Sequence, residues 1–408
     1  MLLIYNLALR IYYIIIFIFS FFNKKAKLWI QGRRHIIYPD YEQSIWFHFA
    51  SLGEFEQGRP VLEQLRNTHP QRKIIITFFS PSGYEIRKNT PLADAVYYLP
   101  LDIPANARKF IDAINPAIAV FTKYEYWYYF FREINKRNIS LYIISGIFRP
   151  NQVFFKWHGS LHRKMLNFVS HFFVQDEQSK QLLKSLNINN VTISGDTRFD
   201  RVWTNAEQPK SLPEIAAFKN NQNVFITGST WPADEQLIAT LTHQYPNWKF
   251  IIAPHEIIKE NINDLIKLLP QNSAVKYSQL TALNQQFSPQ TLIIDNIGTL
   301  SALYQYGDVA YIGGGFGAGI HNTLEAAAFG LPVIFGPNYA KFKEAKDLIA
   351  NGAGFTVNSA DELKKITGIL IADEPYRASA SKKAKDYVTG NIGATGVIVE
   401  YIEKVDKL

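Results

Sequence analysis

The residues best suited to chemistry lie in a glycine-rich block, Gly313–Glu325, in which five glycines precede a histidine, an asparagine and a glutamate. Glycine lets the backbone approach a ligand closely. The helix expected to open near Asn322 offers unpaired N–H groups and a partial positive charge to a phosphate. Glu325, one helical turn further in, can accept the two hydroxyls of a ribose. The block therefore predicts a phosphate- and ribose-binding site.

The block has two other possible interpretations. A plain βαβ crossover with a flexible glycine turn stays open, because glycine loops alone are weak signals. A nicotinamide dehydrogenase is disfavoured, because no G-x-G-x-x-G frame fits between Gly313 and Gly319 and no acid follows at the expected distance.

A second candidate follows the expected strand Ile45–Phe49, in the segment Ser51-Leu52-Gly53-Glu54. Ligands of open α/β sheets gather at such strand ends, so Ser51 and Gly53 are candidate substrate contacts. Glu54 is the candidate general base, since a carboxylate in a semi-dry cleft can take a proton from an attacking hydroxyl. Alternatively, Glu54 complements the dipole of a helix expected to begin near Glu56.

Three further segments each follow an expected strand and precede a helix. They are Gly228-Ser229-Thr230, Pro254-His255-Glu256 and Asn296–Leu300. Each alone is also typical of helix capping. Because they would lie at the same edge of one sheet as Gly313–Glu325, together they predict one ligand cleft.

Composition narrows the class of protein. The chain has 408 residues, 47% of them hydrophobic, which is enough for two domains. It has no cysteine, which excludes disulfides, thiolate metal sites and cysteine nucleophiles. A net charge of +8 favours an anionic membrane surface or phosphorylated and carboxylated substrates. Nucleic acid is disfavoured, because the aromatic residues are not interleaved with basic ones.

The N-terminal residues Leu2–Phe22 form an apolar run followed by three lysines. About 20 apolar residues can span a bilayer. Arg10 at mid-membrane would cost roughly 2.5–3.5 kcal/mol, so an interfacial helix is equally open. The lysines favour a cytoplasmic position for the rest of the chain. A cleaved signal peptide is disfavoured, and a buried core helix is the remaining alternative.

Short apolar runs alternate with helical windows and predict two parallel sheets. The first series is Ile45–Phe49, Ile74–Phe78, Ala95–Leu99, Ala117–Phe121, Leu141–Ile144, His171–Val174 and Val191–Ser194. The second is Asn223–Thr227, Lys249–Ala253, Ala274–Tyr277, Thr291–Ile294, Val309–Ile312 and Val333–Phe335. We expect an anchor helix at 1–22, a Rossmann-like domain at 23–204, a linker at 205–219 and a second domain at 220–374. Helices in 375–408 are expected to cross back to the first domain.

Read in order, the motifs resemble those of the bacterial 3-deoxy-D-manno-octulosonic acid (Kdo) transferases over nearly the whole chain. The motifs that carry the resemblance are Ser51–Glu54, Glu125-Tyr126-Trp127, Gly195–Asp200, Gly228–Thr230, Pro254–Glu256 and Gly313–Glu325. The resemblance implies the GT-B fold, in which two Rossmann-like domains face a central cleft.

The resemblance also implies an activity, namely inverting transfer of Kdo from CMP-Kdo to the lipid A precursor at the cytoplasmic face of the inner membrane. It implies no metal and no cofactor. Glu54 takes the position of the family's base, and Glu125 that of an acid supporting the acceptor site. The implied CMP-Kdo site consists of Ser229, Thr230, His255, Gly298, Gly314, Gly315, Asn322 and Glu325. Another GT-B transferase or epimerase using a UDP-sugar, and a non-catalytic binding protein, are the alternatives.

The chain departs from the family at several positions. Pro254 stands where the family has an arginine, so another cation must serve the phosphate: Arg198, Lys341 or Lys343. Lys123 and Tyr128 replace an acid and a proline of the acceptor-side segment, and the glycine loop is shorter than in many relatives. Arginine and histidine provide two further candidates. Arg149 is a candidate partner for the Kdo carboxylate, while His158 and His162 stand four apart without an apparent third metal ligand.

Overall fold

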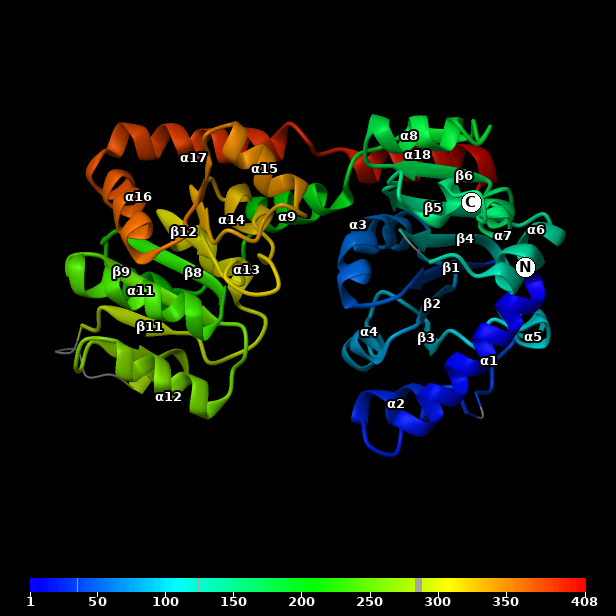
Figure 1. Ribbon diagram of the computed structural model, residues 1–408, viewed down its shortest axis with the longest axis horizontal. Helices are drawn as coiled ribbons and strands as arrows, with labels where there is room; N and C mark the ends of the chain where they lie inside the picture. Colours follow the sequence, from blue (N-terminus) through cyan, green and yellow to red (C-terminus); the bar gives the residue numbers. More distant parts are fainter. Residues whose placement is uncertain (35, 124, 283–287) are drawn as a thin grey trace. The chain divides into compact units, whose positions relative to one another are not determined.

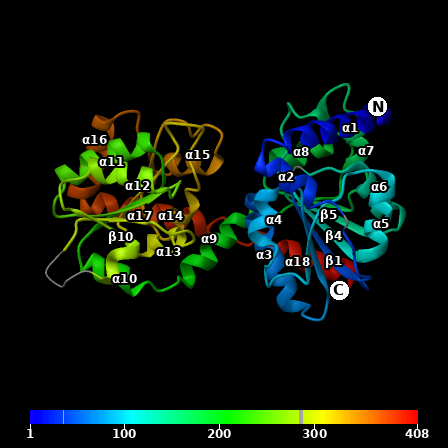
Figure 2. The same ribbon diagram turned by 90° about the horizontal axis from the view of Figure 1, so that it is seen from below.

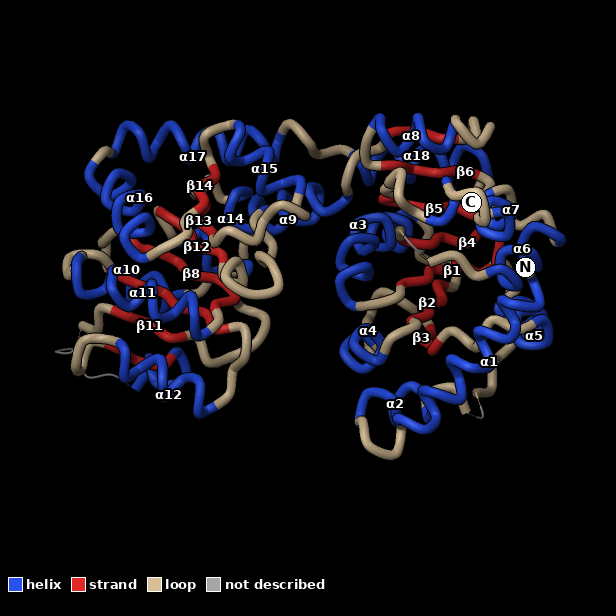
Figure 3. Tube along the Cα trace, in the orientation of Figure 1, coloured by secondary structure: helices blue, strands red, loops and turns tan. Residues whose placement is uncertain are grey.

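The computed structural model describes residues 1–34, 36–123, 125–282 and 288–408 and divides the chain into two compact units (Figure 1). Unit 1 comprises residues 1–201 and 392–408, and unit 2 comprises residues 202–391. Each unit has its own seven-stranded parallel sheet, drawn with red strands in Figure 3. The predicted α/β class, with two Rossmann-like domains and an N-terminal apolar helix, is confirmed. A cleft shared by the two units stays a prediction.

The sheet of unit 1 has the strand order β3-β2-β1-β4-β5-β6-β7. Its strands are β1 (Ser44–Phe49), β2 (Ile74–Phe78), β3 (Ala95–Tyr98), β4 (Pro116–Thr122), β5 (Ser140–Gly146), β6 (His171–Val174) and β7 (Val191–Ile193). The helices are α1 (Leu2–Phe19), α2 (Lys24–Gln31), α3 (Leu52–Thr68), α4 (Pro81–Arg87), α5 (Pro104–Ile114), α6 (Tyr128–Lys136), η1 (Val153–Phe155), α7 (Ser160–Leu166), α8 (Glu177–Lys184) and α18 (Ala394–Asp406).

Both faces of this sheet are buried, which explains its nearly continuous apolar strands. Because side chains alternate along a strand, Ile45 and Phe47 of β1 pack with α3 and α18, whereas Trp46 packs with α5 and α6. Figure 2 shows α3 and α18 on one side of the sheet and α5 and α6 on the other. The core therefore fixes β1 and its following loop from two sides.

The sheet of unit 2 has the order β10-β11-β9-β8-β12-β13-β14. Its strands are β8 (Val224–Thr230), β9 (Lys249–Pro254), β10 (Ala274–Lys276), β11 (Thr291–Ile293), β12 (Val309–Ile312), β13 (Val333–Phe335) and β14 (Gly354–Thr356). The helices are α10 (Pro213–Lys219), α11 (Pro232–Gln244), α12 (Lys259–Leu268), η2 (Tyr277–Ala282), α13 (Leu300–Leu303), η3 (Tyr304–Tyr306), α14 (Leu324–Ala328), α15 (Lys343–Ala350), α16 (Ala360–Ala372) and α17 (Glu374–Thr389). Sequence analysis missed β14, which has three residues and begins with glycine.

The strand order reverses once in each sheet, between β1 and β4 in unit 1 and between β8 and β12 in unit 2. In open parallel sheets, ligands bind outside the carboxyl ends of the strands at this switch point. The segment Ser51–Glu54 follows β1, and Gly313–Glu325 follows β12. The fold thus places both predicted sites at a switch point.

The boundaries between the units differ from those expected. Residues 205–219 were expected to be a linker, but they include the end of α9 (Thr197–Glu207) and all of α10, whose Ile215 and Phe218 are buried. The helix α17 stays in unit 2, and the chain returns to unit 1 only in α18. There the carboxylate of Asp200 accepts hydrogen bonds from the backbone of Gly393 and Thr395. An amphipathic helix can bury one apolar face even when its overall composition is polar. Polar composition alone therefore did not predict α10.

The apolar helix α1 packs one face against unit 1. The Tyr5 hydroxyl donates to Asp102, and the Tyr129 hydroxyl donates to Asn6 at 2.7 Å. The ring of Tyr12 contacts those of Trp29 and Phe79. The opposite face consists mostly of exposed aliphatic residues, with the exposed Arg10 among them, and the helix is long and apolar enough to cross a membrane.

Candidate active site

Glu54 lies in the first turn of α3, which begins at Leu52 instead of near Glu56 as expected. Its Oε2 accepts a hydrogen bond of 2.5 Å from the backbone N–H of Ala50. A backbone N–H just before the helix, which has no partner within the helix, therefore holds the carboxylate. This contact is compatible with the alternative interpretation, in which Glu54 complements the helix dipole. This contact fixes where the group stands at the end of β1.

The surroundings of Glu54 disfavour its charged form. Burial raises the pKa of its carboxyl to about 7, and the nearby carboxylate of Glu125 acts in the same direction. The backbone N–H groups of Ala50 and Ser51 and the ammonium of Lys123 act in the opposite direction. A base whose pKa lies near the operating pH is well matched to proton transfer. The site can thus take a proton from a bound hydroxyl.

Glu125, in the loop after β4, is held by two hydrogen-bonding side chains. Its Oε2 lies 3.3 Å from His48 Nε2 and accepts a 3.0 Å bond from Trp127 Nε1. His48 is fully buried, and burial lowers its pKa although the bond to Glu125 raises it. The neutral ring, with Nδ1 2.8 Å from the Thr77 hydroxyl, then donates from Nε2. His48 and Thr77 therefore position Glu125 beside Glu54, a role that sequence analysis missed.

A basic group lies beside these carboxylates. The Nε of Arg198 donates to Asp196 at 2.9 Å, and the side-chain amide of Gln57 in α3 also donates to Asp196 at 2.9 Å. Burial acts to raise the pKa of Asp196, but Arg198 outweighs it and holds that pKa below its ordinary value. Lys123 lowers the pKa of both Asp196 and Glu54, so its ammonium lies near both. Arg198 and Lys123 can therefore attract an anionic substrate to this edge.

In unit 2, the glycine loop is tied to the end of β8. The N–H of Gly313 donates to the Gly228 carbonyl at 2.9 Å. The buried carboxylate of Asp234 accepts from the N–H of Gly314 at 2.9 Å and from the Tyr311 hydroxyl at 2.7 Å. It also accepts from the N–H of Trp231 at 2.9 Å. One carboxylate thus sets the geometry of both loops, the one after β8 and the one after β12.

Close backbone packing explains why the loop needs glycine. A Cβ at Gly313 would lie 2.3 Å from the Ser229 carbonyl oxygen, and one at Gly315 would lie 2.6 Å from the backbone of Gly336. Gly314 has a φ of +90°, a conformation that other residues rarely adopt. The backbone of Gly313–Gly315 is therefore fixed and buried, and the loop is exposed only further on, at Gly317 and Ala318.

Three aromatic rings stack beside this loop. The ring of His255 stacks on Trp231 at 4.7 Å and on His321 at 4.4 Å. The Trp231 Nε1 donates to His321 Nε2 at 3.2 Å, and burial lowers the pKa of His321, which favours the neutral acceptor form. His255 was predicted as a site residue, whereas Trp231 and His321 were not. Their places directly after Thr230 and directly before Asn322 are the signals that could have found them.

Asn322 and Glu325 lie together, but the helix after them is shorter than expected. The Asn322 amide donates to Glu325 at 3.1 Å, and its oxygen accepts from the N–H of Leu324 at 3.1 Å. Helix α14 begins at Leu324 and has five residues, so Glu325 lies in its first turn and not one turn further in. The pair can still offer an amide and a carboxylate to neighbouring hydroxyls.

The other predicted residues lie in varied surroundings, from the buried Thr230 to exposed loops. Gly298 has a φ of +95°, next to Ile297, which is 93% exposed. Arg149 is exposed, and the Thr230 hydroxyl donates to Glu235 at 3.0 Å. Lys343 pairs with Asp347 at 2.6 Å. Within the described residues, which include His158 and His162, no group of three or more potential ligands could hold a metal ion.

Comparison with known proteins identifies the family. The sequence model of a family described as 3-deoxy-D-manno-octulosonic-acid transferase (kdotransferase) matches residues 25–201. The Kdo transferase of Haemophilus influenzae is 26% identical over 374 residues, which cover 88% of this chain and 87% of that protein. That of Chlamydophila psittaci is 28% identical over 351 residues, which cover 83% and 80%. The chain belongs to the Kdo transferase family. This Kdo transferase is therefore a glycosyltransferase of lipopolysaccharide biosynthesis.

Solved structures agree with the fold of this Kdo transferase. The UDP-GlcNAc 2-epimerase of Neisseria meningitidis superposes with a TM-score of 0.62 at 17% identity, covering 89% of this chain and 100% of that one. Anabaena HepE, solved with UDP, superposes with a TM-score of 0.56 at 14% identity over 90% and 100%. At these identities the likeness shows a shared two-domain α/β architecture alone.

The surroundings of Glu54 predict how activity depends on pH. If ionised Glu54 is the base, kcat/KM rises with pH until Glu54 ionises at about 7, and falls about tenfold per pH unit below that. Glu125→Gln removes a negative charge that raises this pKa, so the midpoint should move to lower pH. Rate profiles of both proteins between pH 5 and 9 check this, and an unmoved midpoint in the variant would contradict the coupling of the two carboxylates.

Proposed function

We propose that this Kdo transferase moves Kdo from CMP-Kdo to the lipid A precursor by a single inverting displacement, with Glu54 as general base. The observation that supports it most is the pair Glu54 and Glu125 at the switch point of unit 1, where burial raises the pKa of Glu54 to about 7. Membership of the family supports the transfer of Kdo. The donor, the acceptor, the inversion and the role of Glu54 are proposed.

In the proposed step, Glu54 accepts the proton of the acceptor hydroxyl while that oxygen attacks the anomeric carbon of Kdo. The bond from this carbon to the CMP phosphate oxygen breaks, and CMP leaves with the electron pair. Attack from the face opposite CMP inverts the anomeric centre. Glu125 keeps the neighbourhood of Glu54 negative and thereby raises its basicity. General base catalysis of this kind contributes typically about 10²–10⁴ in rate.

Unit 2 is proposed to hold CMP at the switch point between β8 and β12. The stack of Trp231, His255 and His321 offers flat rings near the base or sugar. Glu325 is proposed to accept the ribose hydroxyls while Asn322 holds its carboxylate in place. The proposed phosphate contacts are the loop residues Ser229, Thr230, Gly314 and Gly315, with Gly298 nearby. Preorganised donors of this kind stabilise leaving-group charge without a metal.

The acceptor is proposed to bind at unit 1, where Lys123 and Arg198 attract its phosphates or the Kdo carboxylate. Ser51 and Gly53 flank Glu54, and Arg149 is a further candidate contact. The apolar helix α1 fits an enzyme at the inner membrane, where its lipid acceptor resides. Its position on the cytoplasmic face remains part of the proposal. The reaction requires the donor held by unit 2 to reach Glu54.

Product analysis tests the whole proposal. The purified protein is incubated with CMP-Kdo and lipid A precursor, and the product is weighed by mass spectrometry. We expect the precursor to gain the mass of one or more Kdo residues and CMP to be released in the same number. Absence of transfer with this donor, in a sample that is folded and binds CMP, would contradict the donor or the acceptor assignment.

Nucleotide selectivity provides a separate prediction. A ligand that binds only the native state raises the unfolding temperature, and at about 100 times its dissociation constant it stabilises by about 2.7 kcal/mol. We expect CMP to stabilise the protein more than UDP at equal concentration, measured by thermal unfolding. If UDP stabilises more, a UDP-sugar transferase or epimerase is favoured instead.

A further inference from the structure

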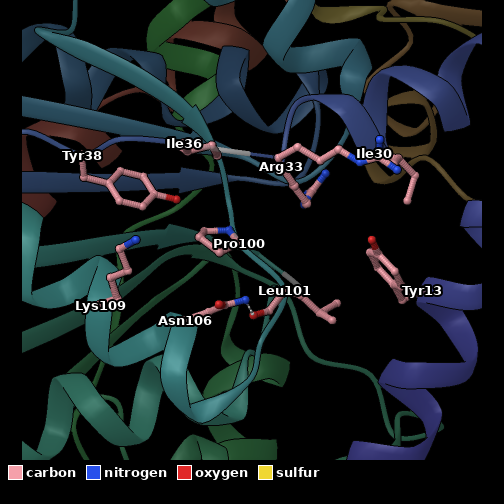
Figure 4. Close-up of a pocket in the computed structure, with 10 residues that line it drawn as sticks. Tyr13, Ile30, Arg33, Ile36, Tyr38, Pro100, Leu101, Asn106 and Lys109 are labelled. Atoms are coloured by element: carbon pink, nitrogen blue, oxygen red, sulfur yellow. Dashed lines mark hydrogen bonds between the residues drawn. The ribbon is translucent and has the colours of Figure 1, made fainter.

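A cavity of about 340 Å³ lies in unit 1 beneath the apolar helix, lined by residues from α1, the end of α2 and α5 (Figure 4). Tyr13 of α1 borders one side, and Asn106 and Lys109 of α5 border the other. Arg33 and Arg34, just after α2, complete the polar lining. Neither Glu54 nor any residue assigned to CMP contributes to it, so the proposed reaction leaves this cavity without a role.

The described lining residues of the cavity are basic or neutral. Three of them are cations, Arg33, Arg34 and Lys109, and none is acidic. Arg33 donates to the carbonyls of Phe79 and Leu99 at 2.7 and 2.8 Å and lies 3.8 Å over the ring of Trp29. Among the described residues, no carboxylate forms an ion pair with any of these three cations. Arg33 is partly buried, whereas Arg34 and Lys109 are exposed. Because no described lining residue is an acid that could neutralise these cations, the cavity suits an anion.

The surroundings of the cavity are apolar and exposed. On α1, Leu3 is 84% exposed, Ile14 is 54% exposed and Ile18 is 53% exposed. Ile37 is 87% exposed and follows Ile36, a lining residue. An anion that carries a large apolar group would bury this surface while neutralising the cations, which a free inorganic ion cannot do.

The contacts of α1 place it along unit 1. The bonds from Tyr5 to Asp102 and from Tyr129 to Asn6 hold its first turns, and the contacts of Tyr12 with Trp29 and Phe79 hold its middle. A helix crossing the bilayer would have to give up these contacts. With one face on protein and the other largely aliphatic but carrying the exposed Arg10, α1 fits a helix lying in the membrane interface.

We infer that this cavity binds the phosphate headgroup of an anionic membrane phospholipid, whose acyl chains run along the outer face of α1. The phosphate diester sits among Arg33, Arg34 and Lys109, with the Tyr13 hydroxyl and the Asn106 amide as neutral neighbours. Lipid binding here docks the enzyme with α1 in the interface. The inference does not depend on the donor or acceptor of the proposed reaction.

A matched pair of double variants tests the inference in the full chain. The test variant is Arg34→Ala with Lys109→Ala, which removes two lining cations and leaves the structural Arg33 in place. The control is Lys27→Ala in α2 with Arg108→Ala in α5, which removes two exposed cations that do not line the cavity. Thermal unfolding of both variants verifies that each is folded. The two variants have the same net charge, so the general attraction of basic residues to anionic lipid is reduced equally in both. A difference in lipid binding between them therefore indicates a defined site.

Two measurements read out binding. Native mass spectrometry in neutral detergent should show wild type and control each retaining one phosphatidylglycerol, and the test variant losing it. Cosedimentation with phosphatidylcholine vesicles containing phosphatidylglycerol should show at least a tenfold loss of affinity in the test variant and less than threefold in the control. Equal losses in both variants, or retained lipid in the test variant, would overturn the inference.

Competition identifies the source of the phosphate. Bound phosphatidylglycerol should resist phosphatidylethanolamine, inorganic phosphate and lipid A precursor at equal concentration. Displacement by inorganic phosphate would show a free-anion site. One-for-one displacement by lipid A precursor would show that the cavity belongs to the acceptor site. Either result would overturn the assignment to a membrane phospholipid.

Discussion

Glu54→Gln is expected to lower kcat by about 10²–10⁴, the typical contribution of a general base, while CMP binding stays unchanged. The amide keeps the size of the side chain and can still accept from the N–H of Ala50, but it cannot take the acceptor proton. Single-turnover rates with CMP-Kdo and lipid A precursor measure the loss. Calorimetry with CMP measures donor binding separately.

The matched control is Glu56→Gln in the same helix. Glu56 lies two residues further on and pairs with Arg87 at 2.5 Å, so it carries the same charge without the same surroundings. We expect its rate to stay within about threefold of wild type, because Glu56 pairs with Arg59, Arg87 and Arg201 and not with the groups around Glu54. Activity of Glu54→Gln within about tenfold of wild type, about 1.4 kcal/mol of barrier, would show that another group is the base.

Asp234→Ala is expected to destabilise unit 2 and to weaken CMP binding at least tenfold. The substitution leaves the N–H of Gly314 and the hydroxyl of Tyr311 without their buried acceptor. Each buried donor left unpaired costs about 1–3 kcal/mol, so for two donors we expect a loss of about 2–6 kcal/mol in unfolding free energy. Denaturant unfolding and CMP titration measure the two effects.

Two other variants separate loop geometry from charge. Asp264→Ala removes an exposed acid of the same unit that pairs with Lys267, and we expect a change within about 0.5 kcal/mol. Asp234→Asn keeps one acceptor oxygen and should lose less stability than Asp234→Ala. If Asp234→Ala binds CMP as tightly as wild type does, the glycine loop does not depend on this carboxylate for its shape.

Sheet formation was predictable because its causes are local in sequence. Runs such as Ile74–Phe78 are apolar at consecutive positions, as strands buried on both faces must be, and β2 has the same bounds. Helix starts were less predictable. Glu54 lies inside α3 and not before it, because Ser51 is the last residue with extended backbone before the helix. The sequence alone offered several possible caps, so it did not fix the first residue of the helix.

The sequence by itself determined the α/β class, the family and the positions of the glycine loop and the Glu54 segment, because these depend on residue type and spacing along the chain. Only the tertiary structure decided which polar groups surround them. His48 supports Glu125 from 77 residues away, and Asp234 holds Gly314 from 80 residues away. Pairing across such distances depends on strand order, which brings β1 beside β4 and β8 beside β12. Burial in the folded chain then raises the pKa of Glu54 and lowers that of His48, an effect that no local sequence pattern encodes.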